Sequence, residues 1–232
     1  MIGIICAEKE ELNEIIKFTK NIKKEKIGSL EFITGEILDK KCVLALSGVG
    51  KVHGTMCVQS MIIRYNPKAV INIGVAGAVD HKLNIGDIVI GTSVVQHDFD
   101  VSAFPERKKG EISGIEKVEI PCAKRILEIL LSASQNIKNI KTHCGTVLTG
   151  DQFINSTEKL NQIRNDFNGI ACEMEAGAIG QVCFLNNVDF GIIKSISDTA
   201  DKNSSVDFKK FIECASKNSV NLLMEFIKLY RD

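Results

Sequence analysis

Short apolar runs with few internal charges recur along this chain, and stretches with helical periodicity separate most of them. Runs of this kind are typical of strands that are buried on both faces, because a strand with one exposed face alternates apolar and polar residues. The predicted strands are residues 2–7, 31–38, 42–48, 69–76, 87–95, 142–150 and 189–197. Such strands need helices on both sides, so the pattern predicts a three-layer α/β fold around a central twisted sheet.

Four helices are predicted from apolar spacing and end signals. Residues 51–65 repeat apolar side chains at helical spacing and stop before Asn66-Pro67, a dipeptide that disfavours further helix. A second helix is expected to start at Pro121, and a third covers residues 175–186. The last helix has Asp207 as its expected N-cap and one broad apolar face.

The connection between two of the strands shows that the sheet is mixed. Strands 31–38 and 42–48 are separated by only a few residues, which is too short for a parallel crossover. Residues 99–118 are the least regular segment and predict a long surface loop of functional type or a flexible insertion. Since no composition shift marks a boundary, residues 1–232 are expected to form one domain.

Charge and cysteine content limit the partners of the chain. The 29 basic and 29 acidic residues balance, and no Lys/Arg-rich segment indicates nucleic acid, so a small ligand fits better. The 8 cysteines have no Cys-x-x-Cys spacing and several lie in apolar runs, which predicts buried, reduced thiols. No apolar run reaches about 18 residues and no secretion signal is seen, so we expect a soluble, cytoplasmic protein without a membrane partner.

Acidic residues follow three of the apolar runs. Glu11 comes after the first strand, Glu173 and Glu175 follow the short run GIAC, and Asp198 ends the last strand. Ligands of such sheets bind beyond the carboxyl ends of the strands, so these residues are candidates for a binding cleft. A glutamate in a first helical turn also complements the helix dipole, and an aspartate after a strand often forms a turn. Glu173 and Glu175 are harder to explain in that way, because their apolar neighbours give them little access to water.

Two glycine-rich turns, residues 47–54 and 72–79, also follow predicted strands. Their backbones can approach a ligand closely, although neither has the spacing of a P-loop or of a dinucleotide site. The 4 histidines show no metal-ligand spacing, and no G-x-S-x-G motif is present. The turns and carboxylates together predict a cleft for a small polar molecule, with no metal and no cofactor.

Seven segments then occur in a characteristic order: GIICAEKEEL, SGVGKV, NIGVAGAV with IGDIVI, HDFDVSAF, TGDQFIN, EMEAGAI and SISDTAD. In this order and spacing they resemble the 5′-methylthioadenosine/S-adenosylhomocysteine nucleosidases of the purine nucleoside phosphorylase superfamily. The likeness runs from the first strand to Phe208. It implies irreversible hydrolysis of an N-glycosidic bond by a cofactor-free homodimer, with release of adenine and a 5-thio-substituted ribose.

The resemblance implies roles for three carboxylates. Glu11 would activate the attacking water, Glu175 would bind the ribose hydroxyls, and Asp198 would give a proton to N7 of adenine. The chemistry is consistent with these roles, because an oxocarbenium-like transition state needs an acid at the leaving group and a base on the other side. Burial beside Ser197 and the purine would raise the proton affinity of Asp198.

The resemblance also implies a set of binding residues. The backbone of Phe153 and Ile154 would bind the adenine edge, with the Phe153 ring stacked on the base. Met174 would pack under the ribose, and Glu173 would make structural hydrogen bonds. Phe208 would line the pocket for the 5′ substituent, together with two residues from the other chain of the homodimer, namely Val101 and Phe104 of the partner subunit.

Three positions depart from the family pattern. Lys194 stands where the nucleosidases usually carry arginine, and Val75 stands where they often carry serine; both positions are expected to help hold the catalytic water. Glu8 replaces a methionine that borders the 5′ substituent. A polar or charged tail such as homocysteine is therefore expected to be preferred over a methyl group.

Two other functions stay open from the sequence. A purine nucleoside phosphorylase would bind phosphate with arginines on the glycine turns, but residues 47–54 and 72–79 contain none. Lys51 lacks the bidentate fork of arginine, which favours water as the nucleophile. A non-catalytic sensor of an adenosine-type ligand on the same fold would account for the departures at Lys194 and Val75.

Overall fold

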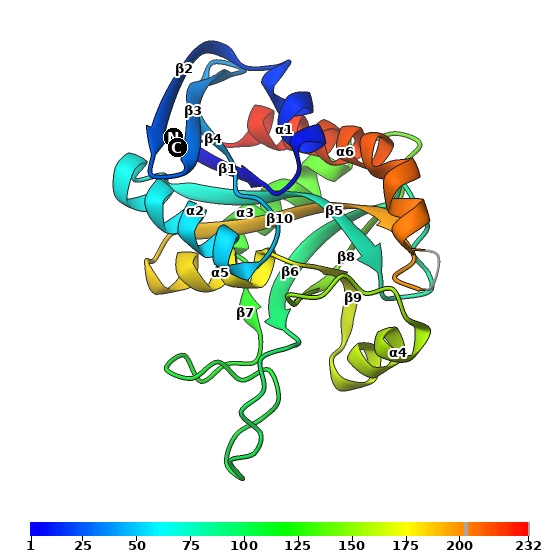
Figure 1. Cartoon of the computed structure of the whole chain (residues 1–232). Coiled ribbons are helices and arrows are strands. Elements are labelled where there is room, and N and C mark those ends of the chain that lie inside the picture. Colours follow the sequence, from blue (N-terminus) through cyan, green and yellow to red (C-terminus); the bar gives the residue numbers. More distant parts are fainter. Residues whose placement is uncertain (202–203, 232) are drawn as a thin grey trace.

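The computed structural model describes residues 1–201 and 204–231 (Figure 1). Its strands are β1 (Ile2–Cys6), β2 (Lys20–Ile27), β3 (Leu30–Ile37), β4 (Lys40–Leu46), β5 (Ala69–Ala78), β6 (Ile88–Gln96), β7 (Ile120–Pro121), β8 (Thr142–Thr149), β9 (Gly169–Glu173) and β10 (Asp189–Asp198). Its helices are α1 (Lys9–Ile16), α2 (Lys51–Tyr65), α3 (Lys124–Ser134), α4 (Thr157–Asp166), α5 (Ala176–Leu185) and α6 (Ser204–Leu229). No helix in these ranges is both long and apolar enough to cross a bilayer.

Helices cover both faces of the sheet (Figure 1). On one face, Val58 of α2 and Ile179 of α5 share a core cluster with Val70 of β5. On the other face, the neighbouring strand residue Ile71 joins a cluster with residues of α1, α3 and α6, such as Phe226. Successive residues of a strand point to opposite faces, so each strand contributes to both cores. The predicted three-layer α/β fold is confirmed.

The strands form one mixed sheet in the order β10-β6-β8-β9-β5-β1-β4-β3-β2, with β7 beside β6. The expected hairpin is the antiparallel pair β3–β4. An additional pairing of β5 with β10 closes β5, β10, β6, β8 and β9 into a ring. Within this ring β9 is antiparallel to β5 and meets it only at the carboxyl ends, where Cys172 lies opposite Gly77. The closure therefore brings the end of β9 to the ends of β1, β5 and β10.

Most of the predicted elements are found. The predicted strands correspond to β1, β3, β4, β5, β6, β8 and β10, and helices 51–65 and 175–186 correspond to α2 and α5. Residues 99–118 contain no helix or strand, only an isolated bridge between Ile112 and Lys117, as the irregular pattern predicts. This segment projects away from the layers, before β7 (Figure 1).

The prediction that Pro121 starts a helix is wrong. Pro121 lies in the short strand β7, and α3 begins only at Lys124. The amides of Cys122 and Ala123 each donate a 2.9 Å hydrogen bond to the backbone of β6 and of β10, respectively. These bonds hold the chain extended at Pro121, so tertiary pairing overrides the local preference of proline for a helix start.

The expected N-cap at Asp207 is also wrong, because α6 already begins at Ser204 and Asp207 lies inside its first turn. At that place its carboxylate complements the helix dipole. Sequence patterns missed β2 and α4 altogether. The lysine-rich β2 is an edge strand that pairs only with β3 and is mostly exposed, so it has no apolar pattern to recognise.

The cysteines of the described residues form no disulfide bond. Most are buried as predicted, but Cys144 on β8 and Cys214 on α6 are exposed, so the expectation of a buried thiol is wrong at these two positions. Both lie on regular elements and outside the cavity described below.

Candidate active site

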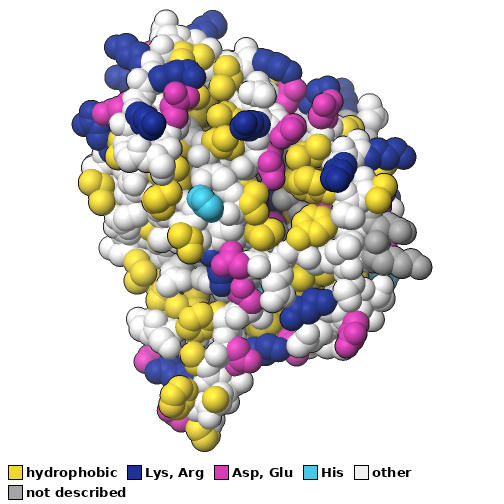
Figure 2. Space-filling view, in the orientation of Figure 1, with side chains coloured by type: hydrophobic (Ala, Val, Ile, Leu, Met, Phe, Trp, Pro, Cys, Tyr) yellow, Lys and Arg dark blue, Asp and Glu magenta, His cyan; other side chains and the backbone are white. Residues whose placement is uncertain are grey.

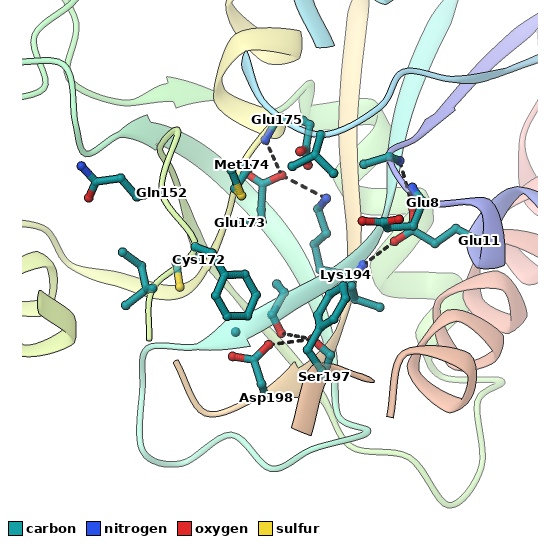
Figure 3. A pocket seen from close by; sticks show the side chains of 18 residues that line it. Glu8, Glu11, Gln152, Cys172, Glu173, Met174, Glu175, Lys194, Ser197 and Asp198 are labelled. Carbon is teal, nitrogen blue, oxygen red and sulfur yellow. Dashed lines mark hydrogen bonds and ion pairs between the residues drawn. The ribbon is translucent and has the colours of Figure 1, made fainter. Parts of the chain in front are cut away.

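A cavity lies at the carboxyl ends of β1, β5, β9 and β10 (Figure 3). Its empty volume is about 630 Å³ including the open mouth, which lies in the range of sites that hold a small ligand. The candidate site residues that line it are Glu8, Glu11, Val75, Phe153, Ile154, Glu173, Met174, Glu175, Lys194, Ser197, Asp198 and Phe208. The remaining two candidates, Val101 and Phe104, do not line the cavity of their own chain.

Some residues of the lining were not singled out from the sequence: Ala7, Val49, Ala76, Gly77, Gln152 and Cys172. Each of them is next in sequence to a candidate residue or lies within a quoted glycine turn. Motif reasoning therefore found the segments that build the cavity. It could not tell which additional side chains face the cavity, because that depends on how the segments bend.

Glu11 is held at the base of the cavity by backbone donors from two strand ends. It is 2% exposed. Its Oε2 atom accepts N–H groups of Ala7 and Glu8 at 3.0 and 3.1 Å, and its Oε1 atom accepts the N–H of Val75 at 3.1 Å. A Cβ atom on Gly74 would lie 2.5 Å from Oε1, so this close approach requires glycine.

The ionisation of Glu11 is shifted toward neutral pH. Burial raises its pKa to about 7, against the opposing effects of the Lys194 charge and of the backbone donors. A carboxylate that titrates near neutral pH and is fixed in one orientation is suited to accept a proton from a ligand or a water molecule.

Lys194 on β10 is a buried cation, and the nearest carboxylate oxygen is Glu173 Oε2, 3.0 Å from its Nζ atom (Figure 3). Burial alone would lower the pKa of Lys194, but Glu173, Glu175 and Glu11 together raise it above its usual value. The side chain is therefore charged, and its charge is shared among three carboxylates. This sharing is the main electrostatic feature of the site.

Glu173, the last residue of β9, is occupied by contacts with the protein. Its Oε2 atom accepts the N–H of Glu175 at 3.1 Å and the N–H of Ala176 at 2.8 Å. Its Oε1 atom accepts the hydroxyl of Thr149. Ala176 begins α5, so the carboxylate lies at a helix N-terminus, where negative charge is stabilised. Together with the ion pair to Lys194, these contacts give Glu173 a structural role in the site.

Glu175 is buried and differs from Glu173 in having few partners. Its Oε1 atom accepts the N–H of Gly50 at 2.8 Å, which ties the first glycine turn to the start of α5. Burial and the nearby Glu173 raise its pKa to about 8. The glycine turn predicted to approach a ligand thus also contacts a cavity carboxylate.

Asp198 ends β10 and is buried. Its Oδ2 atom accepts the Ser197 hydroxyl at 2.8 Å and its Oδ1 atom accepts the N–H of Ala200 at 2.9 Å. Burial raises its pKa above the ordinary value for an aspartate despite these bonds. A Cβ atom on Gly77 would lie 2.8 Å from Oδ1, so the neighbouring strand must carry glycine at this position.

Two aromatic rings, those of Phe153 and Phe208, line the cavity. Phe153 and Phe208 are in edge contact, with centroids 5.8 Å apart and an interplanar angle of 87°. Phe153 is partly exposed, whereas Ile154 beside it is buried. An accessible ring in the lining can stack on a planar ligand.

The cavity therefore combines two buried carboxyl groups from separate segments, Glu11 in the first turn of α1 and Asp198 at the end of β10. Figure 3 shows Glu11 on one side and Asp198 on another, with Lys194 between them and Glu175 beside Met174. Two carboxylates with raised pKa can serve one small ligand as proton acceptor and proton donor.

Comparison with known proteins agrees with this geometry. The family model of the phosphorylase superfamily matches residues 1–228, which defines the class of the protein. The 5′-methylthioadenosine/S-adenosylhomocysteine nucleosidase of Bacillus subtilis (strain 168) is 36% identical over 228 residues, 98% of each chain. The protein of the same description from Psychromonas ingrahamii (strain DSM 17664 / CCUG 51855 / 37) is 38% identical over 227 residues, 97% of each chain.

Solved structures show the same relationship. The 5′-methylthioadenosine/S-adenosylhomocysteine nucleosidase from Neisseria meningitidis in complex with methylthio-immucillin-A has a TM-score of 0.95 and 32% identity, and the match covers 98% of each chain. Futalosine hydrolase of Helicobacter pylori strain 26695 has a TM-score of 0.93 and 30% identity, with 98% of this chain and 97% of that chain covered. The chain belongs to the 5′-methylthioadenosine/S-adenosylhomocysteine nucleosidase family within the phosphorylase superfamily.

The buried pair of Lys194 and Glu173 predicts a stability effect. Glu173→Gln removes the carboxylate nearest to a buried ammonium, so the free energy of unfolding in urea should fall by about 3–5 kcal/mol. Glu213→Gln, at an exposed position of α6, is the control and should change it by less than about 0.5 kcal/mol. Equal stability of Glu173→Gln and the wild type would show that Lys194 does not depend on this carboxylate.

Proposed function

We propose that this protein hydrolyses the N-glycosidic bond of 5′-methylthioadenosine and S-adenosylhomocysteine, with 5′-deoxyadenosine as a further candidate substrate. The products are adenine and the 5-thio-substituted ribose. The observation that carries the proposal is the pair of buried carboxyl groups around one cavity, Glu11 in the first turn of α1 and Asp198 at the end of β10. The names of the related nucleosidases support the same substrates.

In the proposed reaction Glu11 accepts a proton from water as the water oxygen bonds to C1′ of the ribose. The C1′–N9 bond breaks, its electron pair goes to the purine, and Asp198 gives a proton to N7. One carboxyl group gains a proton and the other loses one, so the step is balanced. Burial raises the pKa of Asp198, which favours the protonated form that a proton donor needs. The pKa of Glu11, about 7, suits a group that accepts a proton close to neutral pH.

Positive charge develops on the ribose in the transition state, and we assign Glu175 to it. Its carboxylate would bind the ribose hydroxyls and interact more strongly as the charge develops. Met174 would pack under the sugar. We assign adenine to the ring of Phe153, with its edge on the backbone of Phe153 and Ile154, because these residues line the same cavity as Asp198.

The 5′ substituent is assigned to the part of the cavity near Glu8 and Phe208. Glu8 lines the cavity, and burial, together with the neighbouring Glu10, raises its pKa. A carboxyl group at this place supports a preference for the amino-acid tail of S-adenosylhomocysteine over a methyl group. Comparing kcat/KM for the two substrates tests this preference, and a wide margin for methylthioadenosine would contradict it.

Water, rather than phosphate, is the proposed nucleophile. Among the described residues that line the cavity there is no arginine. Lys51, the cation on the first glycine turn, lies 2.7 Å from Asp98 and is engaged in that ion pair. Without a free bidentate cation the cavity has no evident means to bind a phosphate dianion.

The departures at Lys194 and Val75 affect Glu11 in this account. The Val75 contact to Glu11 comes from its backbone N–H, so it does not require a serine side chain. The Lys194 charge lowers the pKa of Glu11, as an arginine at this position also would. Because the contacts that hold and tune Glu11 are kept despite these two departures, they support an enzyme rather than a sensor that binds the ligand without cleaving it.

The reaction predicts a defined set of activities. Purified protein should release adenine from methylthioadenosine at equal rates with and without phosphate, and the sugar product should be 5-methylthioribose rather than 5-methylthioribose 1-phosphate. Asp198→Asn should bind substrate but lose about 100-fold or more in kcat, because it keeps the shape and removes the acid. Glu11→Gln should behave similarly. 5-Methylthioribose 1-phosphate as the product would refute hydrolysis, and full activity of Asp198→Asn would refute the role of Asp198.

We also propose that the protein is a homodimer in which Val101 and Phe104 complete the cavity of the partner subunit. Phe104 is 61% exposed and lies outside the cavity of its own chain. Hydrophobic side chains gather over α2 and α5 on the face shown in Figure 2, and they include Val52, Ile63 and Leu185. An apolar face of this kind supports an interface between copies.

The dimer predicts complementation between variants. Mixing Asp198→Asn chains with Phe104→Ser chains should restore adenine release, because half of the mixed cavities combine an intact Asp198 with an intact Phe104 from the other subunit. Each variant alone should be impaired. A monomer in sedimentation equilibrium, or no recovery after exchange of subunits, would contradict the proposal.

A cytoplasmic location is also proposed. Its support is the cysteine content, since the cysteines of the described chain form no disulfide bond and most are buried.

A further inference from the structure

Three residues outside the cavity lining form a closed set of contacts. Lys51 Nζ lies 2.7 Å from Asp98 Oδ1, and the N–H of Asp151 donates to Asp98 Oδ2 at 2.8 Å. The N–H of Lys51 in turn donates to Asp151 Oδ1 at 2.7 Å. Lys51 begins α2, Asp98 follows β6 and Asp151 follows β8, so this ring joins segments that are far apart in the sequence. We call Lys51, Asp98 and Asp151 the linking ring.

The linking ring differs from the ion pairs on the surface. The side chains of Lys51 and Asp98 are only 20% and 16% exposed, compared with 57% and 40% for the pair of Arg64 and Glu25. The pKa of Asp98 lies below its ordinary value although burial alone would raise it, because Lys51 and the Asp151 amide stabilise the ionised form. Contacts of this kind between partly buried charged groups are stronger than those of exposed pairs.

Each side of the linking ring continues directly into the cavity wall. Gly50, next to Lys51, donates its N–H to Glu175 at 2.8 Å. Beyond Asp151 the chain passes through Gln152 to Phe153 and Ile154, which line the cavity. The linking ring therefore connects two parts of the cavity wall. One is the glycine turn, which contacts Glu175, the residue assigned to the ribose. The other is the segment with Phe153 and Ile154, the residues assigned to adenine.

We propose that Asp98 is a positioning residue that sets the spacing between residues 47–51 and residues 151–154, and thereby the fit of the nucleoside. As far as the nucleoside is concerned, this inference rests on the proposed function. Asp98 does not contact the reacting groups. Glu11 is held by Ala7, Glu8 and Val75, and Asp198 by Ser197 and Ala200, and none of these bonds includes a member of the ring.

This separation predicts which kinetic constant changes. If Asp98 acts on the spacing of the two segments, its loss weakens binding of the substrate and its transition state alike, so KM rises while kcat is nearly kept. A residue that only stabilises the fold would instead lower the amount of active protein, which reduces apparent kcat and leaves KM unchanged.

The kinetic test uses Asp98→Asn, which keeps the shape but removes the charge and one acceptor. KM for methylthioadenosine should rise about fivefold or more, and kcat should stay within about twofold. Lys51→Met removes the ring cation, keeps an apolar stem, and should give the same pattern. Glu25→Gln is the matched control, because it breaks the 2.7 Å pair with Arg64 near the other end of α2 and should leave both constants unchanged.

A second measurement does not depend on the reaction. Amide hydrogen exchange of the ligand-free protein should be about tenfold faster in Asp98→Asn than in the wild type, both in residues 48–52 and in residues 151–154, and unchanged in Glu25→Gln. Unchanged exchange in both segments, or a fall in kcat with unchanged KM, would overturn the positioning role. If the wild type releases no adenine, the proposed function fails, while the exchange measurement still decides whether the ring sets the spacing.

Discussion

One buried ammonium group, that of Lys194, has to balance three carboxylates in the interior of this protein. The sharing is unequal, because Glu173 takes the direct ion pair at 3.0 Å and is further satisfied by backbone donors at the start of α5. Glu175 and Glu11 receive less compensation, and burial raises their pKa values to about 8 and about 7. Incomplete compensation costs stability, but it leaves carboxylates that exchange protons close to neutral pH.

The closure of the sheet brings these groups together. β9 runs antiparallel to β5, so in an open sheet their carboxyl ends would point to opposite edges. Because the strands close into a ring and β9 meets β5 only at its tip, the segment with Glu173 and Glu175 reaches the ends of β1 and β10. Glycines at positions 74 and 77 then allow the strand to pass close to Glu11 and Asp198. The topology and the electrostatics of the site thus depend on each other.

Much of this arrangement could be predicted from local sequence patterns. Buried strands show as apolar runs. Helix α2 ends at Tyr65, because the left-handed conformation of the C-cap residue Asn66 and the proline after it stop the helix. The candidate carboxylates were found because each follows an apolar strand closely in the sequence, and this position can be recognised from local sequence alone. The linking ring could not be predicted in this way, because Lys51, Asp98 and Asp151 lie in three separate segments that meet only in the folded protein. Local sequence was also insufficient for Pro121 and β2. Pairing with β6 decides the conformation of Pro121, and the position of β2 at the edge of the sheet decides its exposure.

The control of Glu11 ionisation by Lys194 can be measured by NMR titration of the side-chain carboxyl carbon of Glu11. The signal is assigned in the ligand-free protein by comparison with Glu11→Gln. We expect a pKa of about 7, so that the proton-accepting form predominates only above that pH. We also expect a higher pKa in Lys194→Met, because the ammonium favours the ionised form. A pKa near the ordinary value of 4.5, or one that Lys194→Met leaves unchanged, would show that Lys194 and burial do not set the ionisation of Glu11.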